Sequence, residues 1–249
     1  MTQPTAAMLV IGDEILSGRT RDANATHLAS VMTEIGISLR EIRVVADDKD
    51  DIVAAVKTLS DRYDYLFTSG GIGPTHDDIT ADCVAAAMGA SIGVRADARA
   101  ILERFYGADD LNDARLRMAR IPEGAELIDN PLSQAPGFCL GNVHVMAGVP
   151  AIFEVMLAGL RPHLKGGAPM LSHAFRVNIP EGDLAGTLRG LAEGHADVSI
   201  GCYPFFRGGM GATIILRATE RAAMVECADL LRSALLKLTD QITETPPKI

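Results

Sequence analysis

Apolar residues in the first two thirds of the chain alternate between short continuous runs and runs with helical spacing. The run Ala6–Ile11 is apolar throughout, which is typical of a strand buried on both faces of a parallel sheet. Apolar positions then recur every three or four residues up to Gly36, which indicates an amphipathic helix. The same order repeats downstream: strands are predicted at 39–45, 65–68, 126–128 and 143–146, and helices around 52–59, 83–88, 101–105 and 153–160. This alternation predicts an α/β fold with three αβα layers, in which helices cover both faces of a mostly parallel sheet.

The pattern breaks at the Gly- and Pro-rich segment Lys165–Pro169, which predicts a linker at about 163–171. We therefore expect two domains, residues 1–165 and residues 170–245. In the second domain the expected order is a strand at 174–179, a helix at 184–191, strands at 198–203 and 212–218, and a final helix whose apolar stripe continues to Ile242. This βαββα order predicts a small α+β domain.

Composition narrows the class of protein. The chain has 249 residues and a formal charge of −9, and 14 Lys and Arg against 23 Asp and Glu fall within residues 1–164, while residues 165–249 hold nine of each. The acidic first part makes nucleic acid an unlikely partner. No apolar run reaches the roughly 18 residues of a membrane span, and the first residues lack the pattern of a signal peptide. We therefore expect a cytoplasmic protein with no membrane partner.

The most informative segment is Ser69–Thr80, which leaves a predicted strand and opens a predicted helix. Its three glycines are Gly70, Gly71 and Gly73. Glycines at a strand exit let backbone N–H groups approach an anion, and a helix N-terminus adds a favourable dipole. The segment is therefore interpreted as a phosphate-binding turn. It lacks the Lys of a P-loop, so we expect a divalent metal to neutralise the phosphates.

Asp77 and Asp78 are suitable oxygen ligands for such a metal. A structural alternative stays open for Asp78, because Thr75-x-x-Asp78 also fits a capping box at the helix start. Further acidic residues, Asp13, Glu14 and Asp47, follow the first two predicted strands and are expected at the same sheet edge. Asp13 and Glu14 also fit the acidic first turn of a helix, and Asn24 fits a helix N-cap.

Several ordered blocks of the sequence resemble the competence/damage-inducible CinA family, whose N-terminal module is similar to the MoaB/Mog molybdopterin-binding domain. The blocks are GDEILSGRTRDANATHL (12–28), ADD (46–48), TSGGIGPTHDDIT (68–80), MARIPEGAELIDNP (118–131), APGF (135–138) and GVP (148–150). Residues 172–240 resemble, by element order, the small KH-like domain that follows in CinA proteins. A C-terminal amidase domain is not expected in a chain of this length.

The resemblance implies a site for a nucleotide or a pterin such as molybdopterin, with a divalent metal (Mg, Mn or Co). It implies catalytic roles for Asp47 and Asp78, with Asp77 and Asp78 as metal ligands. The expected phosphate- or ligand-binding residues are Gly12, Asp13, Glu14, Asn24, Ser69, Gly70, Gly71, Gly73, Thr75, Gly148 and Pro150.

Three functions follow as hypotheses from the resemblance. The first is metal-dependent hydrolysis of nucleotide pyrophosphates such as ADP-ribose or FAD, and the second is molybdenum-cofactor biosynthesis or molybdopterin binding. The third is a non-catalytic nucleotide- or pterin-binding regulatory module, suggested by the loop Ala147–Ile152, which lacks the Glu that usually follows in the family. The motif Gly208–Gly211 spells G-x-x-G but falls between two predicted strands, so we interpret it as a hairpin turn and not an RNA-binding loop. A homo-oligomer is a further expectation.

Overall fold

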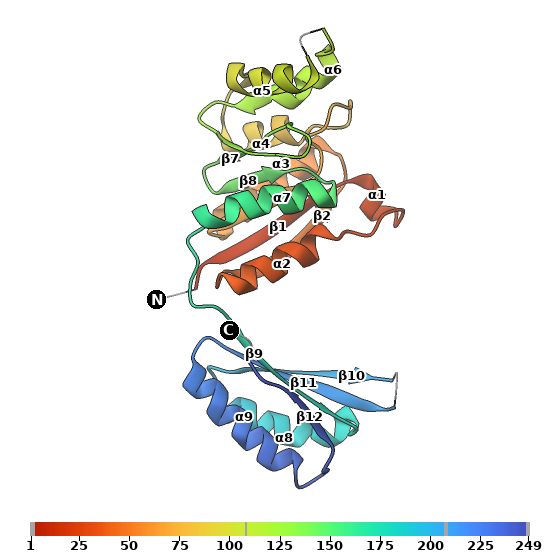
Figure 1. Cartoon of the computed structure of the whole chain (residues 1–249), viewed down its shortest axis with the longest axis vertical. Helices are drawn as coiled ribbons and strands as arrows, with labels where there is room; N and C mark the ends of the chain where they lie inside the picture. Colours follow the sequence, from red (N-terminus) through yellow and green to blue (C-terminus); the bar gives the residue numbers. More distant parts are fainter. Residues whose placement is uncertain (1–2, 108, 207–208, 248–249) are drawn as a thin grey trace. The chain divides into compact units, whose positions relative to one another are not determined.

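The structure, a computed structural model, describes residues 3–107, 109–206 and 209–247. The chain separates into two compact units, Met1–Gly167 and Ala168–Ile249 (Figure 1). Each unit has its own hydrophobic core, and each is described by itself.

A six-stranded sheet forms the centre of the first unit, in the order β2-β1-β3-β8-β7-β6. The strands are β1 (Thr5–Ile11), β2 (Ser38–Val45), β3 (Tyr65–Ser69), β6 (Glu126–Ile128), β7 (Gly137–Leu140) and β8 (Val143–Met146). Strands β2, β1, β3 and β8 are parallel, whereas β7 and β6 are antiparallel to their neighbours. The prediction of a mostly parallel sheet is confirmed.

Helices cover both faces of this sheet. Alternate side chains of β1 point to opposite faces, so β1 contributes to the core on each side. On one face, Ala6, Met8 and Val10 pack with α2 (Asn24–Glu34) and α7 (Pro150–Leu160). On the other face, Ala7, Leu9 and Ile11 pack with α3 (Lys49–Arg62), α4 (Thr80–Met88) and α5 (Ala96–Tyr106). All six of these β1 side chains are buried, which explains the continuous apolar run. The three-layer prediction is therefore confirmed (Figure 1).

Short elements complete the first unit. They are α1 (Asp13–Leu16), β4 (Ile92–Val94), α6 (Asp113–Leu116), η1 (Arg117–Ala119), β5 (Arg120–Pro122) and η2 (Arg161–His163). The antiparallel pair β4 and β5 forms a separate two-stranded sheet. Of these elements, α1, α6 and η1 contribute residues to the cavity described below.

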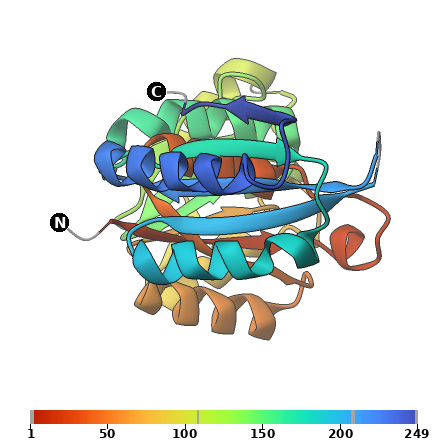
Figure 2. The same cartoon turned by 90° about the horizontal axis from the view of Figure 1, so that it is seen from below.

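The second unit contains a four-stranded antiparallel sheet in the order β10-β11-β9-β12. Its strands are β9 (Leu171–Val177), β10 (Ser199–Phe205), β11 (Gly211–Ala218) and β12 (Ile242–Thr245), and its helices are α8 (Glu181–Gly194) and α9 (Arg221–Leu235). The two helices lie side by side along the strands (Figure 2) and bury their apolar stripes against one face of the sheet. The α+β prediction is confirmed, although the order is βαββαβ. Gly208, the first residue of the predicted hairpin turn, lies outside the described residues.

The prediction that the last helix continues to Ile242 is wrong. Helix α9 ends at Leu235, Leu238 is 54% exposed, and Ile242 begins strand β12, which pairs with β9. The spacing of the last apolar residues fits a helix as well as a turn followed by a strand. Long-range contacts favour the strand. Residues Ile242–Thr245 pair with β9, and Glu244 of β12 forms a two-point ion pair with Arg232 of α9, with bonds of 2.6 and 2.9 Å.

Candidate functional site

A cavity of about 640 Å³ lies where the parallel strands β1, β2, β3 and β8 end. The carboxyl ends of parallel strands meet at one sheet edge, which is the usual position of ligand sites in open α/β sheets. Many of the residues predicted from the sequence line this cavity: Gly12, Glu14, Asp47, Gly70, Gly71, Gly73, Asp77, Asp78, Gly148 and Pro150. Asp13, Asn24, Ser69 and Thr75 are not among its described lining residues, but each is placed beside it by hydrogen bonds to its loops.

The turn after β3 requires glycine at two successive positions. Gly70 has a φ of 109° and Gly71 a φ of 68°, both in the region that favours glycine. A Cβ atom on Gly70 would collide with the backbone carbonyl oxygen of Ile11, and one on Gly71 would collide with the Thr80 hydroxyl. The glycines therefore allow the turn to pack directly against the end of β1.

Asp78 closes the same turn from its far end. Its Oδ2 accepts hydrogen bonds from the Thr75 backbone N–H (2.8 Å) and hydroxyl (2.5 Å), and its own N–H donates to the Thr75 carbonyl oxygen (3.3 Å). Helix α4, however, begins only at Thr80 after an N-cap at Ile79 that forms no side-chain capping bond to the described residues. The capping-box alternative is therefore wrong, because these bonds stabilise a loop and not the helix N-terminus.

Asp47 lies at the centre of the acidic edge. Its Oδ2 accepts a hydrogen bond of 2.9 Å from the backbone N–H of Asp13, at the start of α1. Burial raises the pKa of Asp47, and the nearby negative charges of Asp13, Glu14 and Asp77 raise it further. Asp47 is therefore a better proton acceptor than an ordinary exposed aspartate.

Asn24 connects two loops of the cavity. Only 2% of this residue is exposed, and its Nδ2 donates to the Ser69 hydroxyl (2.7 Å) and to the Gly148 carbonyl oxygen (2.8 Å). The N-cap alternative for Asn24 is wrong, because the α2 terminus is instead capped by Asp22, whose Oδ1 accepts a hydrogen bond from the Ala25 N–H (2.8 Å). Asn24 and Ser69 therefore position the loops that surround the ligand space.

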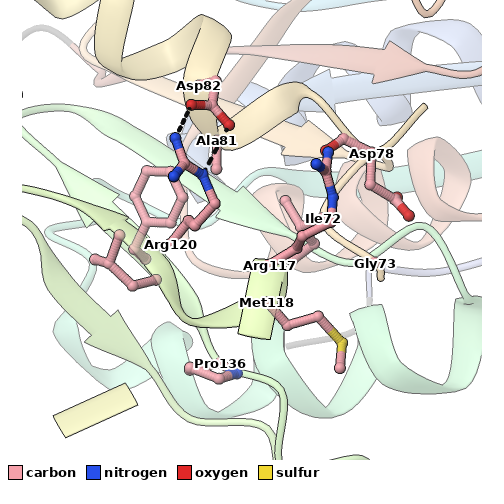
Figure 3. Close-up of a pocket in the computed structure, with 12 residues that line it drawn as sticks. Ile72, Gly73, Asp78, Ala81, Asp82, Arg117, Met118, Arg120 and Pro136 are labelled. Atoms are coloured by element: carbon pink, nitrogen blue, oxygen red, sulfur yellow. Dashed lines mark hydrogen bonds and ion pairs between the residues drawn. The ribbon is translucent and has the colours of Figure 1, made fainter. Parts of the chain in front are cut away.

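A second, much smaller cavity lies behind the glycine-rich turn (Figure 3). Arg120 forms an ion pair with Asp82 there, and the Arg117 Nη2 donates to the backbone carbonyl oxygen of Asp78 (3.1 Å). The volume is about 10 Å³, which is room for roughly one water molecule. A ligand larger than water does not fit here, whereas the cavity of about 640 Å³ at the sheet edge has room for one.

Sequence reasoning missed two side chains on another wall of the larger cavity. Tyr106 of α5 and Arg115 of α6 both line it, together with Met118 of η1 and the loop residues Asn130 and Ser133. Met118 and Asn130 fall within the sequence block that resembles the CinA family. Tyr106 and Arg115 belong to no motif and are brought to the cavity only by the packing of α5 and α6.

Among the described residues, no group of three or more His, Cys, Asp or Glu side chains is placed to hold a metal ion. Mg²⁺ commonly binds through one or two carboxylates, with waters and substrate phosphates as its other ligands. Asp77 and Asp78 together line the cavity, so the donor set fits a metal that binds together with a phosphorylated ligand. None of the described helices combines the length and the apolar character that crossing a membrane requires.

Comparisons with known proteins agree with this architecture. Residues 7–166 match the family described as a probable molybdopterin binding domain, and residues 169–240 match the middle domain of FAD synthase. A protein of Pyrobaculum calidifontis is 34% identical over 212 residues, which cover 81% of both chains.

Two further similarities concern CinA proteins. A CinA-like protein of Myxococcus xanthus is 33% identical over 71% of this chain, and the aligned region spans only 46% of that relative. The crystal structure of the protein CinA from Thermoplasma acidophilum covers 64% of this chain and 97% of its own, with a TM-score of 0.61 and 35% identity. The chain thus spans about half the length of the CinA-like relatives that it matches. The chain belongs to the CinA family, and its first unit is a MoaB/Mog-like domain of the probable molybdopterin-binding family.

Proposed function

We propose that the first unit is a divalent-metal-dependent hydrolase of nucleotide pyrophosphates such as ADP-ribose or FAD. The observation that carries this proposal is one cavity lined both by the glycine-rich turn and by four carboxylates, those of Glu14, Asp47, Asp77 and Asp78. Backbone N–H groups of such a turn suit a phosphate, whereas four carboxylates repel one unless a cation binds with it. A metal-bound diphosphate satisfies both parts of the cavity.

Asp77 and Asp78 are the proposed metal ligands. The Thr75 backbone N–H and hydroxyl hold one oxygen of Asp78, which limits the freedom of its carboxylate before any ligand binds. When bound, the metal would supply positive charge that stabilises the charge developing on the phosphoryl group.

Asp47 is the proposed general base. The oxygen of a water molecule attacks one phosphorus of the diphosphate, the bond between that phosphorus and the bridging oxygen breaks, and two monophosphates are released. The proton of the water passes to the Asp47 carboxylate, whose raised pKa favours acceptance. The hydrogen bond from the Asp13 N–H fixes the orientation of that carboxylate.

The test is incubation of the purified chain with ADP-ribose or FAD and with Mg²⁺, Mn²⁺ or Co²⁺. We expect release of mononucleotides that depends on the metal and falls by about 10²–10⁴ in the variant Asp47→Asn, as is usual for loss of a general base. The matched control is Asp61→Asn, an exposed aspartate on α3, which should leave the rate unchanged. No mononucleotide release with any of the three metals would overturn the proposal.

A second candidate function is molybdopterin binding or a step in molybdenum-cofactor biosynthesis. The family match over residues 7–166 favours it. It predicts tight binding of molybdopterin by calorimetry, weakened by Asp78→Asn. Tight binding of a nucleotide or pterin without any turnover would instead support a non-catalytic binding module.

A further inference from the structure

Two chemically different sets of residues line the large cavity. One set comprises the glycine-rich turn and the four carboxylates at the edge of the central sheet. The other set comes from α5, α6 and η1, and it consists of Tyr106, Arg115 and Met118. A volume of about 640 Å³ lies well within the roughly 300–1,000 Å³ typical of small-molecule sites. The cavity can therefore hold more of a ligand than its phosphates.

The second set is ordered before any ligand binds. The Arg115 guanidinium lies over the Tyr106 ring, with 4.3 Å between Cζ and the ring centroid. Its Nη1 donates to the backbone carbonyl oxygen of Asp110, and the Arg115 backbone N–H is capped by the Asn112 side chain (3.0 Å). Stacking and tethering thus fix a planar cation above an aromatic ring.

Arg115 is also the one Lys or Arg among the described residues that line this cavity. The planar guanidinium group of Arg and the phenol ring of Tyr are flat, polarizable surfaces on which nucleobases and similar rings stack. Met118 adds an adaptable apolar side chain to the same wall, which suits the face of a heterocycle better than a phosphate.

We propose that Tyr106 and Arg115 form a subsite for the planar heterocycle of a phosphorylated ligand, the base of a nucleotide or the ring of a pterin. This subsite rests on the proposed function in that the phosphates of the same ligand occupy the glycine-rich turn. The heterocycle stacks against the Tyr106–Arg115 pair. The subsite thereby selects ligands that carry a planar heterocycle over those that carry only sugar and phosphate.

The test uses ligands without a pyrophosphate bond, so that it does not depend on turnover. AMP and ribose 5-phosphate share a phosphorylated ribose and differ in the base, and a phosphorylated pterin provides the other ring. Calorimetry with the full chain should show AMP or the pterin bound at least tenfold more tightly than ribose 5-phosphate, since one stacked base commonly contributes that much or more. The tighter of the two ring ligands identifies the source of the ring.

Variants separate stacking from charge. Tyr106→Ala and Arg115→Ala should weaken binding of the ring ligand about tenfold and leave ribose 5-phosphate unchanged, whereas Tyr106→Phe should bind like the wild type. Arg115→Lys keeps the charge but loses the planar group, so it should also weaken ring binding. Arg104→Ala, an exposed arginine on α5, is the matched control.

Three results would overturn the subsite: equal affinities for AMP, the pterin and ribose 5-phosphate, no measurable binding of either ring ligand, or an Arg115→Ala loss that is equal for ligands with and without a ring. The last result would mean that Arg115 contacts phosphate. Failure of the hydrolase proposal has a different signature, because it removes mononucleotide release and leaves the preference for ring ligands intact.

Discussion

The packing of the glycine-rich turn against β1 can be tested by the substitution Gly70→Ala. The added Cβ would sit at a φ of 109° and collide with the Ile11 carbonyl oxygen, a backbone atom that cannot move without disturbing β1. A strained backbone position costs about 1–3 kcal/mol, and overpacking about 1–3 kcal/mol more. We therefore expect Gly70→Ala to lower the free energy of unfolding of the first unit by about 2–6 kcal/mol.

Gly89→Ala provides a reference with a positive φ and no collision. Gly89 has a φ of 69° at the C-terminus of α4, and no described atom lies within 4 Å of the Cβ that alanine would add. This variant should lower the free energy of unfolding by about 1–2 kcal/mol, through the strained backbone conformation alone. The difference between the two variants reports the collision with Ile11 together with the additional backbone strain of a φ of 109°.

Urea-induced unfolding followed by tyrosine fluorescence measures both variants. Three of the four tyrosines, Tyr63, Tyr65 and Tyr106, lie in the first unit, so the signal reports mainly on that unit. If Gly70→Ala is no more destabilising than Gly89→Ala, the turn does not pack against the end of β1 as described.

Three further substitutions test individual contacts. Asn24→Ala removes both hydrogen bonds of a buried amide and should lower the free energy of unfolding by about 2–4 kcal/mol in urea titrations. A loss below about 1 kcal/mol would contradict its bridging role. Asp22→Ala should cost about 1 kcal/mol through loss of the α2 N-cap, measured in the same way, with no loss expected if Asn24 were the cap. The Arg232 guanidinium lowers the pKa of Glu244, so the ion pair stabilises the second unit above pH 4.5 and this stabilisation is lost as the pH falls below that value. Glu244→Gln should flatten this part of the pH dependence of unfolding, and an unchanged profile would refute it.

The central sheet, and the acidic and glycine residues at the carboxyl ends of its strands, could be predicted because their sequence signals are local. Six consecutive apolar residues suffice to identify β1, since a strand covered by helices on both faces needs apolar side chains at every position. Once the strands are parallel, their carboxyl ends must share an edge. Asp47 and Gly70 could therefore be expected at one site although 23 positions separate them in the sequence.

Features that depend on long-range contacts could not be predicted in this way. Ile242 has the spacing of a helix residue, and only its pairing with Val177 makes it part of a strand. Asn24 has the residue type and the position of a helix cap, yet its side chain bonds to residues 45 and 124 positions away. Such a residue has two satisfactory local explanations, and tertiary packing selects between them.

The cavity therefore depends on residues of two kinds. Asp47 and Gly71 face the ligand space, whereas Asn24 lies behind it and joins the glycine-rich turn to the loop at Gly148. Because one buried amide holds both loops, a shift of either loop must break a hydrogen bond of 2.7 or 2.8 Å. The two walls of the phosphate region are thus coupled mechanically before a ligand binds. This preorganisation reduces the ordering cost of binding, and it explains why a site built largely from loops can still have a defined shape.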